Sequence, residues 1–225
     1  MPAYIHDIII ANPDTAIPQQ TIREIMKERL ARDRKTEAII HRIYTQSGIE
    51  KRHTVIGDFL EKSDDAFFNR ALSGKDTPST AERNVLYKTE ATSLFLEVGK
   101  KLLLQNPEID KSIITHVITV SCTGFFAPGP DFEVVKGLGL SASTQRFHIG
   151  FMGCYAAFPA LKMAAAFCEA DPNACVLVIC AELCTIHIQS ENDIDNLLAS
   201  SVFADGAAGV LVSSQKPTKK GFRMN

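Results

Sequence analysis

Residues 174–180 form an almost uninterrupted apolar run, Ala-Cys-Val-Leu-Val-Ile-Cys, and this run limits the possible folds more than any other feature. Its length and β-branched content are typical of a strand that is covered on both faces. Strand-like and helix-like segments alternate on either side of it, from Ile113–Ser121 to Ala207–Val212. This alternation indicates an α/β layered architecture with a mostly parallel sheet and right-handed crossovers.

The remaining patterns predict the other elements. We expect further strands at 4–11 and 146–152, and helices at 131–138, 154–170 and 193–203. Capping boxes at Thr21-x-x-Glu24 and Ser79-x-x-Glu82 predict the starts of two helices, the second of which ends before Asn106-Pro107. Another helix should end near Gly48, and residues 53–79 are polar and irregular, which predicts a surface segment.

Charge and cysteine usage exclude several classes of protein. Lys and Arg total 24 against 26 Asp and Glu, so the chain lacks the basic excess of a nucleic-acid-binding protein. It begins without a basic leader and has no apolar run of about 18 residues, so we expect a soluble cytoplasmic protein with no membrane segment. The six cysteines are expected to be reduced thiols, and the absence of C-x-x-C and H-x-x-x-H pairs predicts no metal site.

Cys154 lies in the segment Phe-Met-Gly-Cys154-Tyr-Ala-Ala, between a predicted strand and a predicted Ala-rich helix. Unpaired backbone N–H groups and the helix dipole at such a junction stabilise a thiolate, so Cys154 is a candidate nucleophile. The spacing alone favours a buried, inert cysteine, because an isolated G-C-x-A motif is a weak signal.

Four motifs, in order, make the chain similar to the chalcone-synthase-like, type III polyketide synthase family of the thiolase superfamily. Residues 120–131, Val-Ser-Cys-Thr-Gly-Phe-Phe-Ala-Pro-Gly-Pro-Asp, resemble the family's C-T-S-G…P-G-A-D segment. Gly153-Cys154-Tyr-Ala resembles its G-C-F-A nucleophile segment, Val178–Glu182 its V-V-C-S-E strand, and Val202–Ala208 its L-F-G-D-G-A-A turn. A stretch at Ser47–Arg52 also matches the family's S-x-I-x-K-R pattern. The resemblance implies a thiolase-like layered fold with a mostly parallel mixed sheet between helices, of which residues 1–225 are the N-terminal half.

The same resemblance implies the chemistry. Cys154 would accept the acyl group of a starter acyl-CoA, which is then condensed with malonyl-CoA by a decarboxylative Claisen reaction, with no metal or bound redox cofactor. Phe203 matches the aromatic gatekeeper between the CoA tunnel and the condensation cavity. Arg42 matches a residue that grips the CoA phosphates, and the resemblance also implies a homodimer. The positions that match the cavity lining are Cys122, Thr123, Glu182, Cys184 and His187.

Departures from the family pattern qualify these expectations. The other two CoA-gripping positions hold Ile39 and Gln46, so other cations such as Lys51 and Arg52 would be needed. Cys122, Cys184 and His187 replace threonines that are typical of plant enzymes, which favours a bacterial-type enzyme with an altered cavity.

Two alternatives remain at the level of the sequence. A ketoacyl-synthase-III-like initiator of fatty-acid synthesis shares the fold and the cysteine. A non-catalytic thiolase-like half that binds a partner is also compatible, because the family fold consists of two similar halves and this sequence supplies material for one; the family's catalytic histidine and asparagine are expected beyond residue 225.

Overall fold

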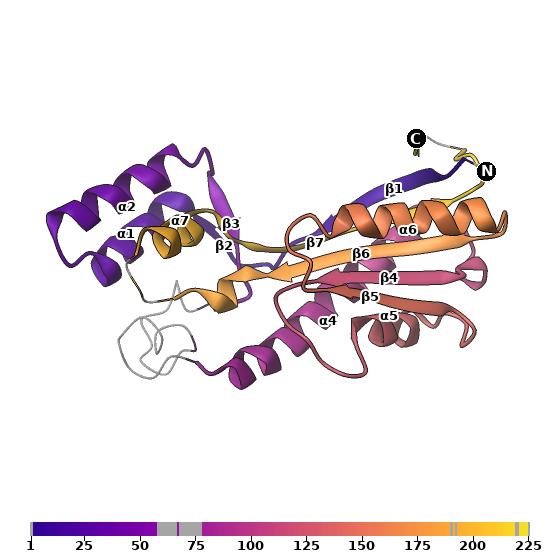
Figure 1. The fold of residues 1–225 in the computed structure, drawn as a ribbon, viewed down its shortest axis with the longest axis horizontal. Coiled ribbons are helices and arrows are strands. Elements are labelled where there is room, and N and C mark those ends of the chain that lie inside the picture. Colours follow the sequence, from indigo (N-terminus) through magenta and orange to yellow (C-terminus); the bar gives the residue numbers. More distant parts are fainter. Residues whose placement is uncertain are drawn as a thin grey trace. The chain divides into compact units, whose positions relative to one another are not determined.

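A computed structural model describes residues 2–57, 67, 78–189, 191, 193–218 and 221–224. The chain divides into two compact units (Figure 1). Residues 1–11, 87–182 and 206–225 make up the first, which we call the sheet unit. Residues 12–86 and 183–205 make up the second, which we call the helical unit.

The sheet unit is built on a six-stranded sheet with the order β5-β4-β6-β7-β1-β8. Strand β4 pairs in parallel with both β5 and β6, whereas β1 pairs antiparallel with β7 and β8. The apolar run predicted as a central strand is β6, and the outcome is the expected mixed α/β sheet. The strands are β1 Tyr4–Ala11, β4 His116–Ser121, β5 Gln145–Gly150, β6 Cys175–Leu183, β7 Asp205–Ser213 and β8 Phe222–Arg223.

Helices cover both faces of this sheet, as Figure 1 shows for α6 on one side and α5 on the other. On one face, Ala160 and Ala164 of α6 (Ala157–Ala170) pack against apolar side chains of β4 and β6. On the other lie α5 (Pro130–Leu138) and α4 (Thr80–Gln105), which is close enough to β7 that a Cβ on Gly209 would come within 2.5 Å of Val98. Burial on both faces explains why β6 has an almost continuous apolar sequence.

The helical unit contains α1 (Gln19–Leu30), α2 (Arg34–Gln46) and α7 (Ile194–Val202). A two-stranded antiparallel sheet joins β2 (Ala16–Pro18) to β3 (Lys51–His53), and the 3₁₀ helix η3 spans Cys184–His187. Helix α2, whose end near Gly48 was predicted, packs on α1 and α7, and its Ile40 and Tyr44 are buried. The short 3₁₀ helix η2 (Lys111–Ile113) precedes β4 in the sheet unit.

The predicted helix starts had mixed outcomes. Ser79 and Glu82 form the expected capping box, in which each side chain accepts the other's backbone N–H. The box predicted at Thr21 was wrong, because α1 begins two residues earlier, at Gln19, with Pro18 as its N-cap. Of the predicted surface segment 53–79, residues 58–66 and 68–77 lie outside the described residues. None of the helices described is both long and apolar enough to cross a membrane.

Candidate active site

Cys154 lies in a turn between β5 and α6, with its side chain exposed. The backbone takes left-handed φ values at Phe151 (+56°) and Gly153 (+79°), which reverse the chain after β5. A left-handed φ is unfavourable for a residue with a Cβ, so the turn is locally strained at Phe151. The strain lies immediately before the candidate nucleophile.

The predicted helix start at Cys154 was wrong, since α6 begins at Ala157. Two N–H groups that the sequence suggested would be unpaired are used locally, by Ala156 to the Gly153 carbonyl at 3.1 Å and by Phe158 to the Tyr155 carbonyl at 2.9 Å. Cys154 therefore occupies the turn that leads into the helix and not its first turn. The predicted strand-to-helix junction itself is present.

Glu182, near the end of β6, holds the segment that follows β4. Both carboxylate oxygens accept the backbone N–H of Cys122, at 2.9 and 3.0 Å. The hydroxyl of Thr123 donates to the same carboxylate at 2.7 Å, and that of Ser121 at 3.3 Å. Three donors on one carboxylate fix the backbone at this point.

Cys122 connects this array to the turn that carries Cys154. Its sulfur accepts the backbone N–H of Gly153 at 3.1 Å, and its thiol contacts the Gly153 carbonyl at 3.7 Å. The structure therefore brings together four of the predicted site residues in the sheet unit: Cys122, Thr123, Cys154 and Glu182.

The ring of Tyr87, on α4, packs against the same segment at Gly124. A Cβ on Gly124 would come within 2.1 Å of the Tyr87 ring, so the ring can lie there only because residue 124 is glycine. Burial raises the pKa of Tyr87 to about 12. Tyr87 was not predicted as a site residue, although it lies on the long helix whose start and end were predicted.

The surface next to Cys154 is apolar. The rings of Phe125 and Phe151 lie 6.0 Å apart, and both are more than half exposed. Further exposed apolar side chains on the same turn and on the start of α6 are those of Met152, Tyr155 and Phe158.

The remaining predicted site residues belong to the helical unit. Phe203 follows α7 directly and is 44% exposed. Cys184 and His187 are the first and last residues of η3. Arg42 lies exposed on α2, where its Nε donates to the side chain of Gln46 at 3.2 Å.

Asp205 anchors η3 within the helical unit. Its carboxylate accepts the N–H of Thr185 at 2.8 Å, the hydroxyl of Thr185 at 2.5 Å and the N–H of Val55 at 2.8 Å. Burial raises the pKa of this carboxyl, and the hydrogen bonds oppose that rise. Its Phe-Ala-Asp-Gly context was part of the recognised motif, but only the folded chain assigns the side chain its partners.

Arg52 does not match the expectation of an exposed cation for phosphates. Its side chain is buried, 5% exposed, and its guanidinium donates to backbone carbonyls. Lys51 beside it is exposed.

Three further cysteines lie in apolar surroundings, which raises the pKa of Cys168 and Cys180 to about 11 and that of Cys175 to about 12. Thiols in this state are weak nucleophiles. Within the part of the chain that is described, no group of three His, Cys, Asp or Glu side chains is arranged to hold a metal ion.

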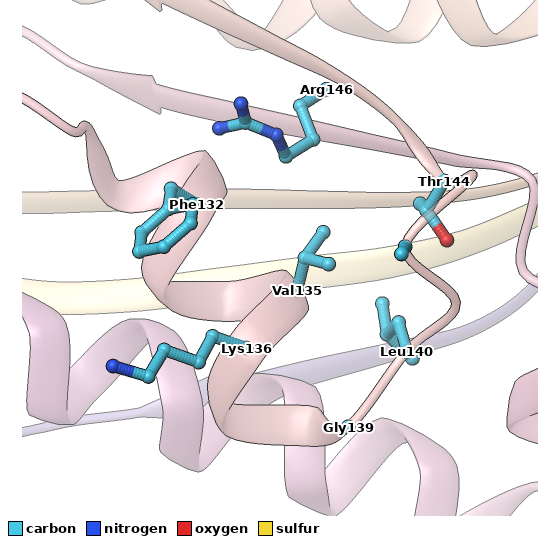
Figure 2. A pocket seen from close by; sticks show the side chains of 8 residues that line it. Phe132, Val135, Lys136, Gly139, Leu140, Thr144 and Arg146 are labelled. Carbon is cyan, nitrogen blue, oxygen red and sulfur yellow. The ribbon is translucent and has the colours of Figure 1, made fainter.

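A separate cleft of about 380 Å³ lies along α5 and the loop after it (Figure 2). Phe132 projects into it between two cations, with the Arg146 guanidinium carbon 5.4 Å and the Lys136 nitrogen 6.0 Å from its ring centre. None of the predicted site residues lines this cleft.

Comparison with known proteins gives consistent results. The chain matches the model for "Chalcone and stilbene synthases, N-terminal domain" over residues 2–216. It is 33% identical over 208 residues to the alpha-pyrone synthesis polyketide synthase-like Pks18 of Mycobacterium tuberculosis, which covers 89% of this chain and 51% of that protein.

Solved structures show the same relationship. The C-terminal type III polyketide synthase domain of Steely1, a type I/III hybrid from Dictyostelium, superposes with a TM-score of 0.87 at 27% identity, over 99% of this chain and 59% of that one. The 1,3,6,8-tetrahydroxynaphthalene synthase of Streptomyces coelicolor gives 0.82 at 24% identity, over 96% and 58%, and this likeness concerns the fold alone. The chain thus spans roughly half of each of these relatives, 51% to 59% of their length.

Proposed function

Since the chain belongs to the chalcone and stilbene synthase family, we propose that it supplies the acyl-accepting half of a type III polyketide synthase. Residues 1–225 would be the N-terminal half of the catalytic domain. The single observation that carries this proposal is the exposed thiol of Cys154 in a strained turn, beside the segment that Glu182 fixes. An exposed cysteine on a rigid support suits covalent catalysis, whereas a structural cysteine is usually buried.

Cys154 would begin the reaction by attacking the thioester carbonyl of a starter acyl-CoA. A bond forms between its sulfur and the acyl carbon, the bond to the CoA sulfur breaks, and CoA leaves as the thiol. Malonyl-CoA then loses CO₂, and the carbanion left on its methylene carbon attacks the acyl carbon. The new carbon–carbon bond releases Cys154, and the lengthened chain now carries CoA. Repetition and ring closure would give the polyketide.

The other residues have supporting roles in this proposal. Apolar side chains near Cys154, such as Phe125 and Phe151, suit the acyl part of a starter. Phe203, Cys184 and His187 would line the cavity, with Phe203 as its gate, and Arg42 would contact a CoA phosphate. Thr123 and Cys122 would form the cavity wall that Glu182 holds in place.

The proposed substrates are acyl-CoA and malonyl-CoA, and the proposed assembly is a cytoplasmic homodimer without metal or bound redox cofactor. Reduced thiols at the six cysteines would fit a reducing compartment. Similarity to polyketide synthases does not favour the ketoacyl-synthase-III-like alternative or a non-catalytic half.

The decisive experiment incubates the full-length protein with a panel of acyl-CoAs and malonyl-CoA and identifies products by mass spectrometry. A matched Cys154→Ala variant serves as the control, and it should give no product. Product formation without acyl carrier protein supports the proposal. A strict requirement for acyl carrier protein would instead point to the initiator of fatty-acid synthesis.

A further inference from the structure

The last carbonyl groups of α7 are bound by side chains from other parts of the helical unit. A helix end leaves its last carbonyls without partners in the helix, so donors must come from elsewhere. Arg52 donates two such hydrogen bonds from a single nitrogen. Its Nη1 binds the carbonyl of Ser200 at 2.6 Å and that of Phe203, the residue that follows α7, at 2.9 Å. The second bond holds the backbone of the residue proposed as the gate.

Arg52 is itself held on two sides. Its Nε donates to the side-chain oxygen of Gln19 at 2.8 Å, and Gln19 in turn donates to the carbonyl of Ser201 at 2.7 Å. The guanidinium carbon lies 5.5 Å from the centre of the Tyr44 ring. We call Arg52, Gln19 and the carbonyls that they bind the α7 clamp.

Burial of the Arg52 guanidinium is unfavourable for the stability of the folded protein. Burial is the largest influence on the pKa of Arg52 and lowers it, whereas Tyr44 and the charge of Asp205 oppose this, and none of its hydrogen bonds to described residues goes to a carboxylate. Its third nitrogen, Nη2, is buried and has no partner among the described residues. Buried charges and unpaired donors both cost free energy, and an apolar side chain of similar size often serves stability better.

Phe203 combines a fixed backbone with an exposed side chain. Its N–H donates to the carbonyl of Ala199 at 3.1 Å and its carbonyl accepts from Arg52, yet the residue as a whole is 44% exposed. Asp205, two residues further on, is tied to Thr185. The chain is therefore held on both sides of a residue that is 44% exposed.

From this geometry we propose that Arg52 is a positioning residue that sets where the Phe203 ring stands, and thereby which starters enter and how long the product grows. The inference rests on the proposed function, in which Phe203 is the gate. Arg52 acts through the backbone of Phe203 and touches no substrate. It differs from the phosphate-binding role that its sequence suggested, because the buried guanidinium is occupied by carbonyls.

The test compares three variants of the full-length protein with the wild type. Arg52→Lys keeps the charge but has one nitrogen in place of the planar fork, so it cannot hold Gln19 and both carbonyls together. Gln19→Met removes the acceptor of Arg52 Nε and is the second test variant if Arg52→Lys does not fold. Tyr44→Phe is the matched control, because Tyr44 donates to the Ser200 carbonyl at 2.9 Å but not to that of Phe203.

Three quantities are measured: the ratio of shorter to longer products, the KM for acyl-CoA, and amide hydrogen exchange in residues 200–206. In Arg52→Lys and Gln19→Met we expect a changed product ratio and exchange faster by about tenfold, since a hydrogen bond from a charged donor is weakened. In Tyr44→Phe we expect the wild-type ratio despite a lower melting temperature. KM should change little in Arg52→Lys, because CoA does not contact Arg52.

The outcomes separate the inference from the function on which it rests. If the wild type makes no condensed product, the proposed function fails, and the inference on product length fails with it. If the wild type is active but Arg52→Lys keeps its product ratio, or shifts it only as far as Tyr44→Phe does, Arg52 is merely structural. A large rise in KM with an unchanged ratio would assign Arg52 to CoA binding and also overturn the inference.

Discussion

Glu182 receives the backbone N–H of Cys122 on both oxygens of its carboxylate, at 2.9 and 3.0 Å. This contact links the end of β6 to the segment after β4. The sulfur of Cys122 in turn accepts the backbone N–H of Gly153, the residue before Cys154. The position of the candidate nucleophile therefore depends on hydrogen bonds between segments that are far apart in the sequence.

Replacement of Glu182 tests that dependence. Glu182→Gln should lower the free energy of unfolding by about 1–3 kcal/mol, because an amide cannot accept all three donors and one would be left unpaired. Thermal denaturation measures the loss. Glu169→Gln, on the exposed end of α6, is the control and should stay within about 0.5 kcal/mol of the wild type. Equal stability of both variants would mean that the carboxylate contributes nothing to the fold.

Cys154 should be the residue that starter acyl-CoA acylates. It is the exposed cysteine on the strained turn, whereas the thiol of Cys122 is engaged with Gly153. Peptide mapping after incubation of the full-length protein should find the acyl mass on the peptide that contains Cys154. Cys122→Ser should leave that label in place. A label on Cys122 or Cys184 in the wild type would overturn the assignment.

Thiol alkylation should distinguish the cysteines by pH. The pKa of Cys168 and Cys180 is raised to about 11 and that of Cys175 to about 12, so these thiols stay protonated at neutral pH. Raised pKa values mean less thiolate at a given pH, and iodoacetamide should therefore modify Cys154 first at pH 7 to 8, roughly. Mass spectrometry of time points gives the order. Early modification of Cys175 in the folded protein would contradict it.

Loss of the Phe203 ring should alter function more than folding. Because Phe203 is 44% exposed, Phe203→Ala should cost less than the roughly 3–5 kcal/mol of a buried aromatic. We expect the full-length variant to change product length or starter preference. A large fall in melting temperature with an unchanged product profile would show that Phe203 is a core residue instead.

Residues 1–225 alone should not complete a condensation. The family resemblance assigns decarboxylation and enolate stabilisation to a histidine and an asparagine beyond residue 225, and such chemistry needs preorganised donors beside the nucleophile. His148 lies on β5, where its Nδ1 shares a hydrogen bond of 2.9 Å with the hydroxyl of Thr119 on β4. Burial lowers the pKa of His148. Folded residues 1–225, verified by circular dichroism, should give no triketide from malonyl-CoA, whereas the full-length protein should. Turnover by the shorter chain would assign the missing role to His148 or His187.

The sequence by itself determined the order and type of most elements. Continuous apolar runs indicated β4 and β6, and the capping box at Ser79 together with Asn106-Pro107 indicated the start and the end of α4. Its motifs also identified the family, and the strand-to-helix junction around Cys154 was predicted from local pattern, although the turn that precedes α6 was not. Each of these features depends on residues that are near one another in the chain.

Only the tertiary structure decided which distant backbone groups the polar side chains bind. Arg52 looked like an exposed cation for phosphates, but the fold buries it against the end of α7, about 150 residues away. Glu182 looked like a cavity acid, but its oxygens are taken by the segment after β4. Local pattern records the tendency of a residue toward helix, strand or solvent. It does not record which distant carbonyl or N–H group the folded chain brings within about 3 Å of a side chain, and that distance fixes its hydrogen bonds.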